Sequence, residues 1–150
     1  MENLDNKFTR IHSTKDIITG VSFIIAGIIL ATLPTNASLN LMGYLLTPIG
    51  FVLLFALKSN YKLQGYSDVF HKKEYYFPDS AKEALLVAIS TNPAAIDTAE
   101  MGHGNTMRLV VYYSKKSQKA FLQLSEYIPY KYETCSEIFE HSINEINNLI

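Results

Sequence analysis

The sequence has a single cysteine, Cys135, among its 150 residues. One thiol cannot supply an intramolecular disulfide framework or a zinc site with several cysteine ligands. An excess of basic residues is also missing, because 13 Lys and Arg residues stand against 14 Asp and Glu residues and leave a net charge of −1. A chain so close to neutral does not attract nucleic acid, and we expect no nucleic-acid partner.

Charge is absent from one long internal segment. No Asp, Glu, Lys, Arg or His occurs from Ile17 to Leu57, so every charged side chain lies in the rest of the chain. A charge-free run of this length is typical of membrane spans, whereas the remainder has the charge density of an ordinary soluble domain. The composition therefore excludes a uniform soluble domain and a disordered, coiled-coil or collagen-like chain.

The apolar segment divides into two predicted transmembrane helices, residues 17–33 and 39–57, joined by the turn 34–38. Helices of these lengths would measure about 26 and 28 Å, close to the thickness of the hydrocarbon core. Pro34 is expected to end the first helix. Two rival interpretations are a pair of helices buried in a soluble core and a cleaved signal peptide. The rest of the chain is too short to cover such a pair, and the first apolar run exceeds the usual signal-peptide core.

Basic residues flank the predicted hairpin at both ends and are missing from its turn. They are Lys7, Arg10, Lys15, Lys58, Lys62, Lys72 and Lys73. The positive-inside rule then places both ends of the hairpin in the cytoplasm. We expect a multi-pass membrane protein with both termini cytoplasmic, in which residues 1–16 form an N-terminal arm, 17–57 the hairpin and 58–150 a cytosolic domain.

Small residues recur in the two helices at a spacing that permits close packing. Gly20 and Gly27 are seven residues apart on the first helix, as are Gly43 and Gly50 on the second. Seven residues make nearly two turns, so each pair lies on one side of its helix, where another backbone can approach. Packing of the hairpin against itself is the preferred interpretation, and contact with another membrane protein or a second copy is the alternative. Neither span has an ionisable residue, so no ion or proton pathway is expected.

Residues 58–150 suffice for one small α+β domain, an antiparallel sheet with helices on one face. Residues 65–77 are rich in strand-forming types and predict one or two strands. A helix follows, and Ser80 and Glu83 have the spacing of a capping box at its start. Pro93 is expected to open a short second helix through Ala99.

The clearest element is a β-hairpin of residues 106–114 and 119–128 with a polar turn at 115–118. Its expected core side consists of Ala120, Leu122, Leu124 and Ile128. A closing helix is predicted over residues 134–149. Thr134 and Glu137 have capping-box spacing, and the apolar residues after them recur at helical intervals.

Few side chains are grouped as a catalytic or metal site would require. Asp97, Glu100 and His103 follow at three-residue intervals, but Gly102 is expected to end the helix before they could surround a metal. Cys135, near a predicted helix start, is a possible nucleophile if a histidine approaches it. Single cysteines and scattered histidines are common, however, and this interpretation is less favoured. We therefore predict no catalytic residue, no metal and no cofactor.

Tyrosine is the most distinctive residue of the predicted cytosolic domain, which holds nine of the ten in the chain. The candidates for partner binding are Tyr112, Tyr113, Tyr127, Tyr130 and Tyr132. Exposed tyrosine clusters often mark binding surfaces. Half-buried strands are also rich in tyrosine, so both interpretations stand.

These observations predict a small integral membrane protein whose hairpin anchors a cytosolic interaction domain. Its expected role is that of a non-catalytic adaptor or accessory subunit of a membrane complex. Its partners would be the lipid bilayer and a membrane protein, a cytosolic protein or a second copy of the chain. The alternative is a membrane-tethered small-ligand sensor or enzyme with a pocket in residues 58–150.

Overall fold

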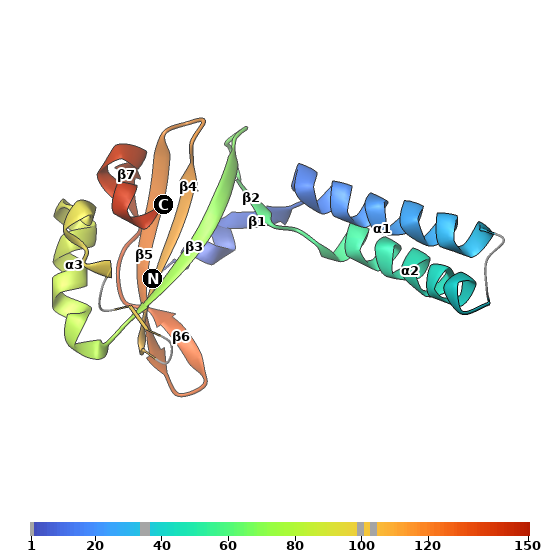
Figure 1. The fold of residues 1–150 in the computed structure, drawn as a ribbon. Coiled ribbons are helices and arrows are strands. Elements are labelled where there is room, and N and C mark those ends of the chain that lie inside the picture. The colour runs from blue at the N-terminus through green and yellow to red at the C-terminus, as the bar shows by residue number, and fades with distance from the viewer. Residues whose placement is uncertain (1, 34–36, 99–100, 103–104) are drawn as a thin grey trace. The chain divides into compact units, whose positions relative to one another are not determined.

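The computed structural model describes all residues except 1, 34–36, 99–100 and 103–104. The chain divides into two compact units, residues 10–60 and residues 1–9 with 61–150 (Figure 1). The first nine residues thus belong with the sheet domain, whereas the sequence prediction assigns them to a separate arm. Most of the expected turn 34–38, with Pro34, lies outside the described residues.

Two helices, α1 (Thr14–Thr32) and α2 (Ala37–Ala56), pack against each other in residues 10–60. Each is long and apolar enough to cross a membrane. The buried residues of α2 are Gly43 and Gly50, whereas large apolar side chains such as Phe55, which is 73% exposed, point outward. A helix in a soluble core shows the reverse distribution, with its large apolar residues inside.

Hydrogen bonds join the two ends of this helical hairpin. Ser13 caps α1, because its hydroxyl accepts from the backbone N–H of Asp16 and its own N–H donates to the Asp16 carboxylate. The same carboxylate accepts from the backbone N–H and the hydroxyl of Ser59, both at 2.9 Å. The Nδ1 atom of His12 is 2.6 Å from the carbonyl oxygen of Leu57. The segments entering α1 and leaving α2 are therefore fastened to each other.

The other unit is built on a sheet whose strands follow the order β1-β2-β3-β4-β5-β6. The strands are β1 Phe8–Ile11, β2 Asn60–Leu63, β3 Val69–Phe77, β4 Met107–Ser114, β5 Lys119–Ile128, β6 Lys131–Thr134 and β7 Phe139–Ser142. From β2 onward each pairing is antiparallel, and β6 and β7 pair with different parts of β5. The predicted hairpin with its turn at 115–118 is confirmed as β4 and β5.

The region between β2 and β4 differs in detail from its prediction. Within 65–77 the strand is β3, and Gly65 lies before it with a positive φ of 85°. Helix α3 (Lys82–Thr91) follows a 3₁₀ turn over Asp79–Ala81. The predicted Ser80–Glu83 capping box is wrong, because Ala81 is the N-cap of α3 and makes no side-chain cap. Pro93 opens a single 3₁₀ turn, Pro93–Ala95, and Ala99 lies outside the described residues.

The predicted closing helix over residues 134–149 is wrong. Thr134 ends β6, Phe139–Ser142 forms β7, and Ile143–Leu149 is a 3₁₀ segment. Phe139–Ser142 pairs with Lys119–Leu122 of β5. This ladder satisfies backbone groups that a lone helix would leave unpaired on β5, so tertiary pairing overrides the helical spacing. The capping box of this region is formed by Ser142 and Glu145, not by Thr134 and Glu137.

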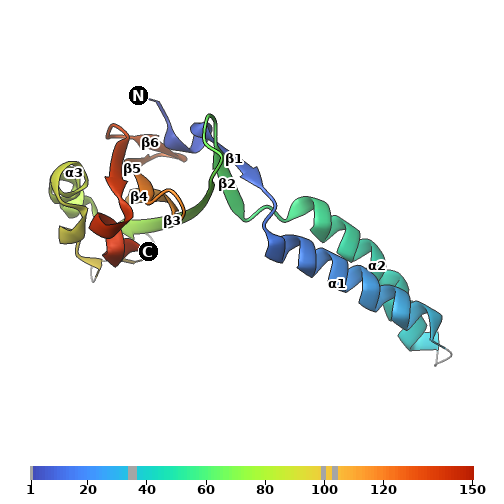
Figure 2. The same ribbon diagram turned by 90° about the horizontal axis from the view of Figure 1, so that it is seen from above.

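Both faces of the sheet carry a core. One face is covered by α3 and the C-terminal 3₁₀ segment, which lie together in Figures 1 and 2. Its fully buried residues include Phe77, Ile89, Leu109, Leu122, Leu124 and Ile146. Ala120, Leu122 and Leu124 thus lie in the core as predicted, whereas Ile128 is only half-buried. The other face packs against the N-terminal residues through Leu4, Phe8, Leu63, Phe70, Val110, Tyr112 and Phe121.

One glutamine fastens the N-terminal segment to this second face. The side chain of Gln123 is 1% exposed, accepts from the backbone N–H of Leu4 at 2.7 Å and donates to the carbonyl of Glu2 at 2.8 Å. The ring of Phe8 stacks on that of Tyr112, with centroids 3.9 Å apart. Residues 2–9 are therefore an integral part of the sheet domain.

Candidate functional site

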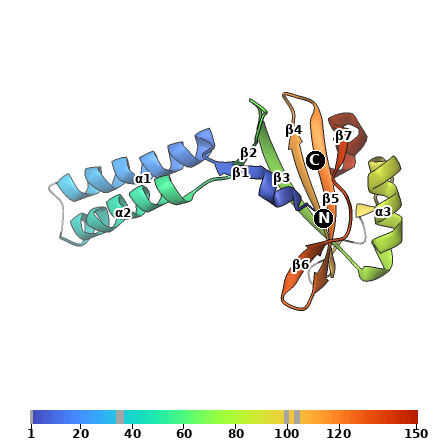
Figure 3. The same ribbon diagram turned by 180° about the vertical axis from the view of Figure 1, so that it is seen from behind.

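The β5–β6 hairpin carries the most exposed aromatic side chain of the domain and projects from one end of the sheet (Figure 3). Its turn is Pro129–Tyr130, between the paired residues Ile128 and Lys131. Tyr130 is 98% exposed and has a φ of 76°. Proline followed by a residue with positive φ matches a type II turn, whose second position favours glycine. The turn thus exposes the large side chain of Tyr130 to solvent while its backbone adopts an unfavourable conformation.

Next to this turn, two tyrosines and an arginine form a stacked group. Tyr127 and Tyr132 face each other across β5 and β6, with ring centroids 5.2 Å apart. The guanidinium carbon of Arg108 lies 4.7 Å from the centroid of the Tyr132 ring, a cation–π distance. Tyr127 is 47% exposed, and Tyr132 is half-buried. The hairpin therefore presents Tyr127 against Tyr132, which stacks on Arg108, and extends Tyr130 into solvent from its turn.

An ion-pair network lies on the same sheet face as Arg108. Lys72 is 2.7 Å from a carboxylate oxygen of Asp5 and 2.6 Å from one of Glu74. Burial alone would raise the pKa of Asp5, but hydrogen bonds from Lys72 and Tyr112 outweigh it and hold that pKa below its usual range. The pKa of Glu74 is lowered in the same way, and that of Lys72 is raised by its two carboxylates against the effect of burial. The network therefore ties the N-terminal segment to β3 while all three groups are charged.

We expect the stability of the domain to depend on pH through this network. Asp5 and Glu74 have lowered pKa values, so their contribution is complete above about pH 5 and is lost as pH falls below about 4. Lys72 has a raised pKa, so its contribution is lost only as pH rises above about 10.5. Unfolding free energies measured between pH 2 and 11 should show this plateau. Asp5→Asn should lower the unfolding free energy on the plateau and weaken its fall at acid pH. An unchanged fall at acid pH would contradict the role of Asp5 in the network.

The structure places the remaining two predicted tyrosines elsewhere. Tyr112 is 1% exposed, and its hydroxyl donates to Asp5 at 2.7 Å. Its assignment to an exposed partner surface is therefore corrected, because its ring belongs to the core beneath the N-terminal segment. Tyr113 is half-buried on the opposite face of the sheet, and its ring centroid is 5.6 Å from that of His71. The five tyrosines thus do not form one surface.

The four candidate glycines lie between α1 and α2. A Cβ atom added to Gly20 would be 2.9 Å from the Cα atom of Leu54, and one added to Gly50 would be 2.7 Å from the backbone nitrogen of Ile24. Gly27 and Gly43 likewise face each other, since a Cβ on Gly43 would lie 2.6 Å from the carbonyl oxygen of Gly27. These positions are needed for close contact of the two backbones, which is the preferred interpretation of their spacing.

The remaining candidates for chemistry are the grouping of Asp97 with Glu100 and His103, and Cys135. Among the described residues, no group of three or more His, Cys, Asp or Glu side chains could hold a metal. Glu100 and His103 lie outside the described residues, so the structure does not test their grouping with Asp97. Burial raises the pKa of the Cys135 thiol, which disfavours the reactive thiolate.

The ion-pair network of Asp5, Lys72, Glu74 and Arg108 was not identified from the sequence. Lys72, Glu74 and Tyr76 occupy every second position of β3, so the period of two in a strand could have placed them on one face. Nothing local indicates that Asp5 and Arg108 join them from distant parts of the chain, since this follows from the docking of the N-terminal segment.

Comparison of the chain with known protein families, curated proteins and solved structures finds no match.

Proposed function

We propose that the chain is an integral membrane protein in which α1 and α2 cross the bilayer as a hairpin and anchor the sheet domain. The distribution of side chains in the two helices supports this. Their buried positions are mainly glycine, and their exposed positions are large and apolar, as expected where lipid replaces water. Backbone hydrogen bonds within each helix satisfy its polar groups in lipid, apart from the one that Pro48 of α2 cannot donate.

The proposed orientation has both termini and the sheet domain in the cytoplasm. Lys7, Arg10 and Lys15 lie at or before the start of α1, and Lys58 and Lys62 follow α2. Basic residues close to the ends of spans are retained on the cytoplasmic side.

The proposed role is that of a non-catalytic adaptor or accessory subunit, which binds a protein partner through Tyr127 and Tyr130. The observation that carries this role is Tyr130, a fully exposed aromatic ring at a turn position that favours glycine. Backbone strain of this kind costs about 1 kcal/mol or more, and it persists most often where it serves a function. Tyrosine at the centre of an interface supplies a large contact area with a polar end.

Tyr130→Gly is expected to abolish partner binding without loss of stability. Because the ring is exposed and the backbone strain is relieved, the unfolding free energy should stay the same or rise by about 1 kcal/mol. Gln118→Gly is the matched control, since Gln118 also has a positive φ, 57°, in the β4–β5 turn. We would measure co-purification of the partner with full-length chains from mild detergent, and unfolding of each variant. Gln118→Gly should retain the partner.

A photo-crosslinking amino acid at position 130 provides the complementary experiment. In native membranes it should give one discrete adduct, and the same group at position 118 should not. The adaptor role is excluded if the intact chain purifies with no partner and no second copy. It is also excluded if Tyr130→Gly and Gln118→Gly retain the partner equally well.

A further inference from the structure

An apolar cavity of about 290 Å³ lies beneath the N-terminal segment of the sheet domain. Two polar residues, Lys7 and Gln64, also line it, and the other lining residues are Leu4, Phe8, Leu63, Tyr66, Phe121 and Ile138. Small-molecule sites are typically lined by apolar and aromatic side chains, with few polar groups to orient the ligand. The volume is at the lower end of such sites, so it suits one hydrocarbon chain and not two.

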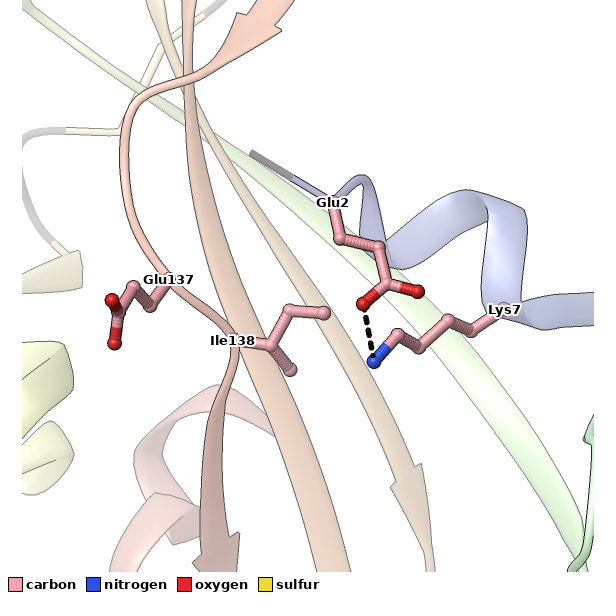
Figure 4. A pocket seen from close by; sticks show the side chains of 4 residues that line it. All are labelled: Glu2, Lys7, Glu137 and Ile138. Atoms are coloured by element: carbon pink, nitrogen blue, oxygen red, sulfur yellow. Dashed lines mark ion pairs between the residues drawn. The ribbon is translucent and has the colours of Figure 1, made fainter.

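A more polar cavity of about 340 Å³ shares two lining residues, Lys7 and Ile138, with the first. Figure 4 shows Ile138 extending toward Lys7, while Glu137 points the other way. The ammonium of Lys7 is 3.0 Å from a carboxylate oxygen of Glu2, and the two side chains are 38% and 67% exposed. An exposed ion pair of this kind contributes little energy, so another carboxylate can replace Glu2 at small cost.

We infer that these two cavities, which share Lys7 and Ile138, bind a single-chain carboxylate amphiphile, such as a fatty acid. The hydrocarbon chain would occupy the apolar cavity, and the carboxylate would take the place of Glu2 beside Lys7. Charge complementarity selects the head group, because Lys7 already holds a carboxylate in this position. The inference goes beyond the adaptor role and does not depend on it.

The test uses the full-length chain in phospholipid nanodiscs and decanoate labelled with ¹³C at its carboxyl carbon. A protein-bound resonance, absent from empty nanodiscs, should appear and should stay ionised to lower pH than decanoate dissolved in lipid. Lys7→Gln should weaken binding about 10-fold. Glu2→Gln should strengthen it about 3-fold, because it removes the competing carboxylate. Lys116→Gln is the charge-matched control, since Lys116 lies in the β4–β5 turn and is 79% exposed.

Opposite effects of the two variants distinguish a ligand site from a merely structural ion pair. If Glu2 and Lys7 only stabilise the fold, both substitutions should lower the unfolding free energy and affect the signal alike. Ile138→Trp, which fills the cavity, should remove the bound resonance in a folded chain. The inference is overturned if no bound resonance appears, if Glu2→Gln and Lys7→Gln act in the same direction, or if Ile138→Trp binds normally.

Discussion

Gly27→Ile is expected to separate α1 from α2 and to lower the unfolding free energy of the hairpin by about 3 kcal/mol. A Cβ atom at Gly27 would lie 2.6 Å from the backbone nitrogen of Thr47. Backbone atoms cannot rotate away as a side chain can, so the helices must move apart along their contact. Overpacking of a close contact costs about 1–3 kcal/mol, and a rigid backbone neighbour favours the upper end.

Ala26→Ile adds the same kind of side chain one residue away, on the exposed side of α1. It should leave stability unchanged, since isoleucine suits lipid as well as alanine does. Unfolding of full-length chains in mixed micelles, followed by circular dichroism, measures both variants. Equal stability of the two variants would contradict the close packing of α1 and α2 through glycine.

Gln123→Leu is expected to release the N-terminal segment and to lower the unfolding free energy of the sheet domain by about 3 kcal/mol. Leucine has a similar shape, but it leaves the N–H of Leu4 and the carbonyl of Glu2 without their partner. Each buried polar group left unpaired costs about 1–3 kcal/mol. The carbonyl of Ser136 loses its hydrogen bond from the glutamine as well.

Amide hydrogen exchange at Leu4 reports on this hydrogen bond directly. Exchange should accelerate in Gln123→Leu and stay slow in Gln64→Leu, a control at an exposed glutamine of the same domain. The assignment of Gln123 as the anchor is incorrect if Leu4 remains protected in both variants.

The N-terminal segment was not predictable as part of the domain. Leu4 and Phe8 are the large apolar residues of its described part, and they become fully or nearly buried. Two residues in a polar stretch show no period, so they indicate neither a strand nor a helix. Their burial depends on contact with Phe70 and Phe121, which come from distant parts of the chain and share a face only in the folded sheet. A stronger local signal was available at Ser13 and Asp16, whose capping-box spacing marks the start of α1.

The C-terminal region shows how a helical pattern can mislead. Phe139, Ile143 and Ile146 are spaced like one face of a helix, yet Phe139 lies in β7 and the others in a 3₁₀ segment. The long β5 offers an edge that β6 covers only from Ser125 onward. Residues 139–142 pair with the first part of this β5 edge. Local propensity does not reveal that an unpaired edge is present there.

The tyrosines could be predicted as a group but not sorted by exposure. Neighbours Tyr112 and Tyr113 point to opposite faces of β4, and the N-terminal segment buries the first of them. Tyr130 follows Pro129 in a two-residue turn, and this context does favour an exposed position. The hairpin β4–β5 and the two apolar helices were predictable because each has a strong local period or a long apolar run.

One pair of cysteine variants tests the membrane topology of the hairpin directly. In a Cys135→Ser chain, a single reporter is introduced as Ser38→Cys near the start of α2 or as Lys116→Cys in the β4–β5 turn. Intact cells are treated with a membrane-impermeant maleimide, then permeabilised and treated again, and the membranes are washed with alkali. We predict labelling of Ser38→Cys in intact cells, labelling of Lys116→Cys only after permeabilisation, and retention of both in the membrane. The reverse labelling pattern would contradict the proposed orientation, and release of the chain by alkali would contradict its insertion in the membrane.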